Sequence, residues 1–92
     1  METDNFIFIL TNSACPEQYN IIDKSNKFIA YLNMRWGKLN VHPYLFDEKN
    51  KEYYVDYKKT LYTCDFTDEY LGVIPEKLKV KIFNEIDDTL SN

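Results

Sequence analysis

Polar and aromatic side chains occupy every second position on both sides of Gly37 and form one set, which includes the only arginine and the only histidine of the chain. The members of this set are Tyr31, Asn33, Arg35, Asn40, His42 and Tyr44. An arginine fork binds phosphate or carboxylate groups, and aromatic rings stack on bases or fill pockets in a protein partner. The set therefore predicts a binding face, either for a protein or for a nucleotide base with its phosphate.

Groups that could do covalent or metal chemistry are sparse. One histidine and two distant cysteines, Cys15 and Cys64, lack the spacing of a zinc site. Cys15 and His42 have the chemistry of a nucleophile and a base, but no sequence feature brings them together. Two glycines are too few for a glycine-rich phosphate loop. We therefore expect a non-catalytic protein without a metal or cofactor.

Strands must position the binding face, because the residues on either side of Gly37 alternate with period two. The opposite set of this alternation is predicted for the core and consists of Phe28, Ala30, Leu32, Met34, Trp36, Leu39, Val41 and Leu45. Gly37 and Lys38 are predicted as the central residues of a type II′ hairpin turn. Pro43 has no amide hydrogen, which predicts either a sheet edge or a bulge at that position.

The remaining pattern predicts strands at 5–11, 17–24 and 53–58, with 61–66 either extending the last of these or pairing with it. A helical turn is expected at 67–72 and a longer helix from Pro75, whose apolar stripe comprises Leu78, Ile82, Phe83, Ile86 and Leu90. A strand at 77–82 is the competing interpretation. The predicted fold class is α+β: an antiparallel sheet of about five strands with one C-terminal helix packed on one face, in a single domain over 1–92.

The sequence leaves open which face of the sheet the helix covers. If the helix lies over the alternating polar set, Tyr31 and Tyr44 belong to the core and form no site. If it lies over the other face, the set is exposed.

The net charge of −4 arises entirely from residues 60–92, which carry seven acids and three lysines. Such an acidic end disfavours direct contact with nucleic acid or an anionic membrane and suits a basic protein partner. Its candidate interaction patch is Glu85, Asp87 and Asp88; the two adjacent aspartates do not share a helix face and are expected to be solvated.

The longest apolar run, Phe6 to Leu10, is too short to span a bilayer, and no secretory signal is visible. We expect a cytoplasmic protein with two free thiols, although a disulfide between Cys15 and Cys64 stays open.

Two short motifs resemble a pattern in small proteins of phages and other mobile elements. The motifs are Cys15-Pro16-x-Gln18-Tyr19 and Ile29-x-Tyr31-Leu32-x-x-Arg35-x-Gly37. The resemblance implies a stoichiometric inhibitor, encoded by a phage or mobile element, that occupies a surface of a host defence protein or sequesters a ligand. It adds Gln18 and Tyr19 to the candidate binding residues.

The expected partner is therefore a host protein. The alternative is a nucleotide or another small ligand, with Arg35 pairing a phosphate and the aromatic rings stacking on the base. A homodimer through strand 39–46 is compatible with the sequence, although Pro43 would blunt that edge.

Overall fold

The structure is a computed structural model that describes residues 1–13, 16–66 and 72–92. These residues form, in order, β1 (Phe6–Asn12), β2 (Glu17–Asp23), β3 (Phe28–Arg35), β4 (Lys38–Asp47), β5 (Glu52–Val55), β6 (Tyr62–Asp65) and α1 (Glu76–Ser91). All paired strands run antiparallel. A sheet of this kind with a C-terminal helix confirms the predicted α+β class. Residues 67–71 of the predicted helical turn lie outside the described part of the chain.

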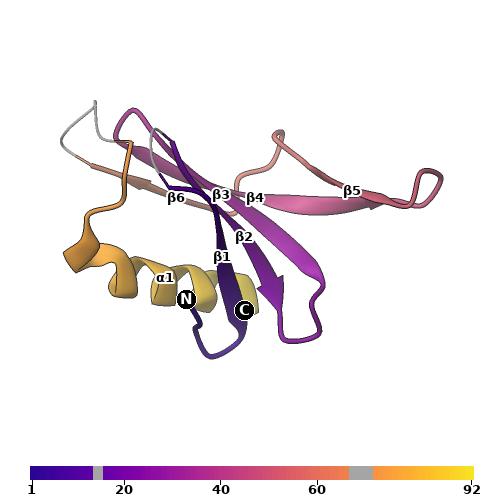
Figure 1. Ribbon diagram of the computed structural model, residues 1–92, viewed down its shortest axis with the longest axis horizontal. Coiled ribbons are helices and arrows are strands. Elements are labelled where there is room, and N and C mark those ends of the chain that lie inside the picture. Colours follow the sequence, from indigo (N-terminus) through magenta and orange to yellow (C-terminus); the bar gives the residue numbers. More distant parts are fainter. Residues whose placement is uncertain (14–15, 67–71) are drawn as a thin grey trace.

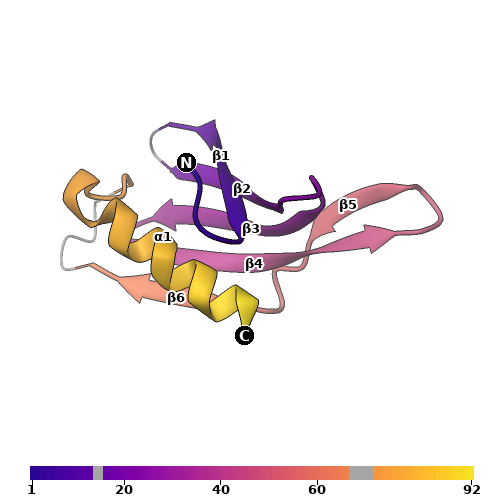
Figure 2. The ribbon, with the colours of Figure 1, turned by 90° about the horizontal axis from the view of Figure 1, so that it is seen from below.

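Three strands pair with β4, which makes it the centre of the sheet. β1, β2, β3 and β4 are neighbours in chain order. The first half of β4 pairs with β6 and its second half with β5, so β6 neither extends β5 nor pairs with it. The β4–β5 hairpin extends past the helix and the other strands along the longest dimension of the molecule, 41 Å (Figures 1 and 2).

Helix α1 packs across one face of the sheet, below it in Figure 1. Its predicted stripe is turned inward, because Ile82, Phe83 and Ile86 are buried. Val80, which the helical interpretation places off the stripe, is exposed. The helix is therefore confirmed over the alternative strand at 77–82.

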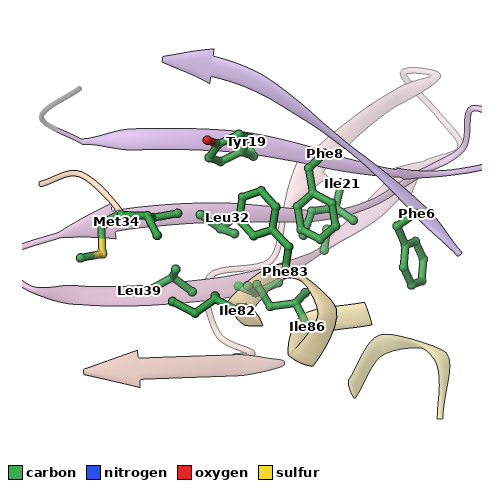
Figure 3. Packing of buried hydrophobic residues seen from close by; sticks show 13 residues of the cluster. Phe6, Phe8, Tyr19, Ile21, Leu32, Met34, Leu39, Ile82, Phe83 and Ile86 are labelled. Atoms are coloured by element: carbon green, nitrogen blue, oxygen red, sulfur yellow. The ribbon is translucent and has the colours of Figure 1, made fainter. Parts of the chain in front are cut away.

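The core lies between α1 and the inner face of β1 to β4 (Figure 3). Phe83 stacks on Phe8 with ring centroids 4.3 Å apart and meets the edge of Tyr19 at 5.1 Å. Burial of one such ring stabilises a fold by about 1.5–3 kcal/mol, so Phe83 is a main anchor of the helix. The other strand residues of the core are Phe6, Ile21, Ala30, Leu32, Met34, Leu39 and Val41.

The β3–β4 turn corrects two predictions. Arg35 pairs with Lys38, so the central residues of the turn are Trp36 and Gly37 and not Gly37 and Lys38. Both have positive φ, 56° and 72°, which is the type I′ geometry and not type II′. Trp36, predicted for the core, is 69% exposed because it sits on the turn instead of in the strand.

Phe28 and Leu45 also leave the predicted core set. The register of β2 and β3 shifts between Ile21 and Ile22, so that Ile22 pairs with Phe28 and one residue of β3 is extra. This bulge turns Phe28 toward Tyr44 on the other face, at a ring distance of 5.3 Å. Leu45 lies in the half of β4 that pairs with β5, and it is exposed.

The segment 39–46, which was considered as a dimerisation edge, is not a free edge over 39–41, because β4 has β3 on one side and β6 on the other there. β4 pairs with β3 along Lys38–Pro43, while β6 ends opposite Val41 and β5 begins opposite Tyr44. Pro43 therefore stands where one partner strand gives way to the next, and its missing amide hydrogen disrupts neither pairing.

Candidate functional site

The helix lies on the face opposite the predicted binding set. Of that set, Tyr31 pairs directly with His42 and Asn33 with Asn40, with their side chains on the side away from the core. The helix instead covers the face of Leu32 and its neighbours in the core. The interpretation in which the helix covers Tyr31 and Tyr44 is therefore wrong. We call this helix-free side the outer face.

A row of polar side chains crosses four strands of the outer face. The register aligns Gln18 of β2 with Asn33, Asn33 with Asn40, and Asn40 with Thr63 of β6. The Thr63 hydroxyl donates to Asn40 Oδ1 at 3.2 Å. Asn33 Oδ1 is buried and accepts no hydrogen bond from the described residues. The row brings Gln18 next to the hairpin residues, as a shared binding face requires.

Charged residues form the next row toward the β3–β4 turn. Arg35 pairs with Lys38, and Lys38 pairs with Asp65 of β6. All three side chains are exposed. Arg35 thus stands at the end of the outer face nearest the turn, separated from the tyrosines by the polar row.

Tyr57 joins Tyr31 and His42 into one aromatic group. Its ring meets the Tyr31 ring at 6.3 Å and the His42 ring at 5.2 Å, both edge to face. His42 Nδ1 lies 2.7 Å from the backbone oxygen of Lys59, and because a carbonyl only accepts, Nδ1 carries a proton in this contact. Tyr57 is strongly exposed and provides the outer surface of the group.

A second aromatic group surrounds Tyr44. Phe28 lies between Tyr44 and Tyr53, and Tyr53 in turn contacts Phe46 at 5.0 Å. The Tyr44 hydroxyl donates to Asn20 Oδ1 at 2.5 Å, which fixes the ring across β3. Burial, followed by the neighbouring tyrosine, raises the pKa of Tyr44. Its phenol is therefore neutral near pH 7 and acts in packing and hydrogen bonding.

The large exposed side chains of the β4–β5 region extend this surface outward. We call them the aromatic arm: Leu45, Phe46, Tyr53, Tyr54 and Tyr57. The register pairs Leu45 with Tyr54 on one face of the hairpin and Phe46 with Tyr53 on the other. The sequence predicts a strand at 53–58, but β5 ends at Val55, and Tyr57 lies beyond it. The sequence also does not show that this strand pairs with the half of β4 that extends past the helix.

Tyr19 is placed differently from its prediction as a binding residue. It is buried in the core, and its hydroxyl donates to Glu17, whose carboxylate is also buried. Burial, together with the Glu17 carboxylate, raises the pKa of Tyr19 to about 12. Lys79 completes the cluster at 3.1 Å from Glu17 Oε2. Tyr19 therefore has a structural role. The alternation pattern did not predict that a polar cluster faces inward.

The predicted acidic patch is only partly a surface. Asp87, expected to be solvated, is 4% exposed and accepts hydrogen bonds from the Thr3 hydroxyl and from Asn5. Glu85 is exposed and accepts from the Tyr62 hydroxyl at 2.8 Å, which ties β6 to the helix. Asp88 is exposed. Two of the three carboxylates thus stabilise the fold.

The structure describes only one of the two cysteines, Cys64. Cys64 is a free, half-buried thiol whose pKa is raised by burial and by nearby Glu85 and Asp65. A raised pKa lowers the thiolate fraction and so the reactivity of the thiol. Cys15 lies outside the described residues, so whether it meets His42, for which no sequence feature speaks, is not tested.

Among the described residues, no three His, Cys, Asp or Glu side chains are grouped closely enough to hold a metal ion. Nor does any helix in those residues have the length and apolar character needed to cross a membrane. Comparison with known proteins returned no matching family model, no matching curated protein and no matching solved structure.

Proposed function

We propose that this chain is a small non-catalytic binding protein that acts by occupying a surface of a partner protein with its outer face and aromatic arm. In line with the resemblance of its two motifs to small phage and mobile-element proteins, the partner we propose is a host protein that the chain inhibits by stoichiometric occupation. The observation that carries the proposal is the aromatic arm itself.

The arm exposes more apolar surface than its own ring contacts cover. Leu45, Phe46 and Tyr54 are each more than 40% exposed and belong to the β4–β5 hairpin. That hairpin extends past the helix that covers the core (Figure 2). The cross-strand pair of Phe46 and Tyr53 stabilises the hairpin. The apolar area that stays exposed on both faces of the hairpin is typical of an interaction site. Tyrosine suits such a site because it provides a large rigid surface with few rotatable bonds.

The outer face adds groups that can direct binding. Tyr57 is held edge-on against Tyr31 and His42, so its ring is ordered before a partner arrives. Arg35 offers a charged fork at the far end of the same face. An ordered aromatic centre with a polar rim is the composition typical of protein interfaces.

The test begins with affinity capture from a host lysate, followed by calorimetry with the purified captured protein. We expect one partner at a one-to-one ratio. Phe46→Ala and Tyr57→Ala should each weaken binding by about 30-fold, the loss typical of an interface hot spot of about 2 kcal/mol. Arg35→Ala should weaken it less, because a rim charge contributes mainly to the association rate.

Val80→Ala is the matched control, since Val80 is an equally exposed apolar residue on the helix side of the molecule. Its affinity should equal that of the wild type. If the arm variants bind like wild type while neutralising Glu85 and Asp88 abolishes binding, the site is the acidic end. If native mass spectrometry instead finds a carried nucleotide and no protein is captured, the protein-binding function is wrong.

A further inference from the structure

The only tryptophan of the chain lies on the turn between β3 and β4, where it adds little to the core. Trp36 is 69% exposed, more than any other large apolar residue in the part of the chain that the structure describes. None of the ring contacts between described residues includes it. A tryptophan stabilises a fold through the large area that it buries, so packing does not explain why one stands here.

The backbone conformation at Trp36 is also unfavourable for a tryptophan. Its φ of 56° lies in the left-handed region, where a bulky side chain is an outlier and where glycine and asparagine fit best. The chain has those two residue types at other such positions, Gly37 with a φ of 72° and Asn26 with a φ of 68°. A type I′ turn prefers the sequence Asn-Gly. The geometry of the turn therefore favours asparagine at position 36 and does not explain the tryptophan either.

The backbone of the β3–β4 turn is held in place from both sides. Lys38 pairs with Arg35 of β3 and, on its other side, with β6. The Phe66 amide, which follows β6, donates to the Gly37 oxygen at 2.7 Å. Such a fixed turn presents the indole of Trp36 at a defined place before any partner arrives, which reduces the entropy lost on binding.

Two cations lie next to the exposed indole. Arg35 precedes Trp36 and Lys38 comes two residues after it, and both side chains are exposed. Neither forms an ion pair with another described residue, although Asp65 is in register with Lys38. A guanidinium without an acid beside it is suited to bind a carboxylate through two parallel hydrogen bonds. The surface complementary to this turn is therefore an apolar pocket with carboxylates at its rim.

We propose that Trp36 is an anchor residue that inserts into such an acid-rimmed apolar pocket of the partner protein. This inference rests on the proposed function, because the pocket belongs to the same partner. Arg35 lies both on the outer face and next to the turn, so the turn continues the proposed surface. The aromatic arm lies at the opposite end of the molecule (Figure 1), and the two would contact the partner separately. Tryptophan and arginine are enriched among the hot spots of protein interfaces.

A nucleic-acid strand is the other occupant with suitable chemistry, since a base can stack on an indole beside cations. The net charge of −4 disfavours it, because the whole chain repels a phosphate backbone. A protein pocket is therefore the occupant that we test.

Trp36→Asn separates folding from binding. Because asparagine suits the turn, the variant should unfold at a higher urea concentration than the wild type. Calorimetry with the purified partner that the capture experiment returns should show about 30-fold weaker binding, as expected for a hot spot. Lys51→Asn is the matched control, because Lys51 is exposed and has the same φ of 56° but carries no aromatic ring. It should raise the urea midpoint as well and leave the affinity unchanged.

Charge reversal tests the rim of the pocket. Lys38→Glu should weaken binding at low salt and lose most of this effect at high salt, because exposed charges are screened there. Tighter binding of Lys38→Glu would mean that the rim of the pocket is not acidic and would overturn the stated chemistry of the partner.

Fluorine NMR observes the anchor directly. Incorporation of fluorotryptophan gives a single resonance, since the chain has one tryptophan, and this resonance should shift when the purified partner is added. If the arm variants weaken binding while the resonance stays unmoved and Trp36→Asn binds like the wild type, this inference is wrong and the proposed function stands.

Three further results would overturn the inference. A lower urea midpoint for Trp36→Asn would give the tryptophan a role in folding. Tight binding of a thymidine oligonucleotide that Trp36→Asn abolishes would assign the turn to nucleic acid. The absence of any captured protein would overturn both this inference and the proposed function.

Discussion

Replacing Glu17 with alanine is expected to destabilise the fold by roughly 3–5 kcal/mol, the cost of removing one partner from a buried ion pair. The Glu17 side chain is 2% exposed, and its carboxylate accepts from the Tyr19 hydroxyl, from the Ile74 amide at 2.9 Å and from Lys79 at 3.1 Å. The variant leaves the Ile74 amide and the Lys79 ammonium without this acceptor. Urea denaturation followed by circular dichroism measures the loss.

Glu76→Ala is the control for this prediction. Glu76 also lies 3.1 Å from the Lys79 ammonium, but its side chain is 89% exposed. An exposed ion pair is screened by water, so its loss should change stability far less than the loss of Glu17. Equal losses of stability in the two variants would show that burial of the Glu17 carboxylate does not add to the stability of the fold.

Asp87→Ala is expected to cost about 3 kcal/mol, because hydrogen bonds to a charged acceptor contribute more than neutral ones. Asp87 holds the N-terminal segment against the helix through Thr3 and through the amide and side chain of Asn5, both at 2.8 Å. Asp88→Ala, at the next position but exposed, should leave stability nearly unchanged. Urea midpoints of the two variants at pH 7 provide the comparison.

Acid should reduce the difference between wild type and Asp87→Ala. Burial alone would raise the pKa of Asp87, but hydrogen bonds from Thr3 and Asn5 outweigh it and hold the pKa below its usual range. A folded-state pKa below the unfolded value means that the unfolded chain binds more protons as the pH falls. The stabilisation is therefore present above about pH 4 and is lost as the pH falls through the folded pKa.

Urea midpoints measured at several pH values test this dependence. The gap between wild type and Asp87→Ala should be wide at pH 7 and narrow near pH 2. A gap that is the same at both would mean that the carboxylate charge is not what stabilises the contact.

The sequence predicts those helices and strands in which the spacing of apolar residues itself shows the buried side. The helix follows from a stripe that recurs through Ile82, Phe83 and Ile86, and the outer face follows from the alternation of Tyr31, Asn33 and Arg35. In both cases a local period reports directly which side of the element is buried. Which face of the sheet is covered could not be predicted in this way, because it depends on where the helix packs.

Long-range polar contacts are what the sequence could not predict. Glu17 and Asp87 look like ordinary surface acids, since their partners lie 57 and 84 residues away. A carboxylate is buried only when several donors converge on it, and convergence is a property of the fold and not of a local pattern. The prediction of the turn residues was wrong for a similar reason. The turn lies one position earlier than predicted because Arg35 pairs with Lys38, and this pairing cannot be read from the local pattern.

The helix that closes the core follows all six strands in the chain, which matters for how the protein folds. The residues of the inner face of the sheet, among them Phe8 and Leu32, are synthesised before Phe83. Contacts between such distant segments make folding slow, and an uncovered sheet exposes apolar surface in the meantime. We therefore expect the future core of a nascent chain of this protein to be accessible to other chains until α1 docks.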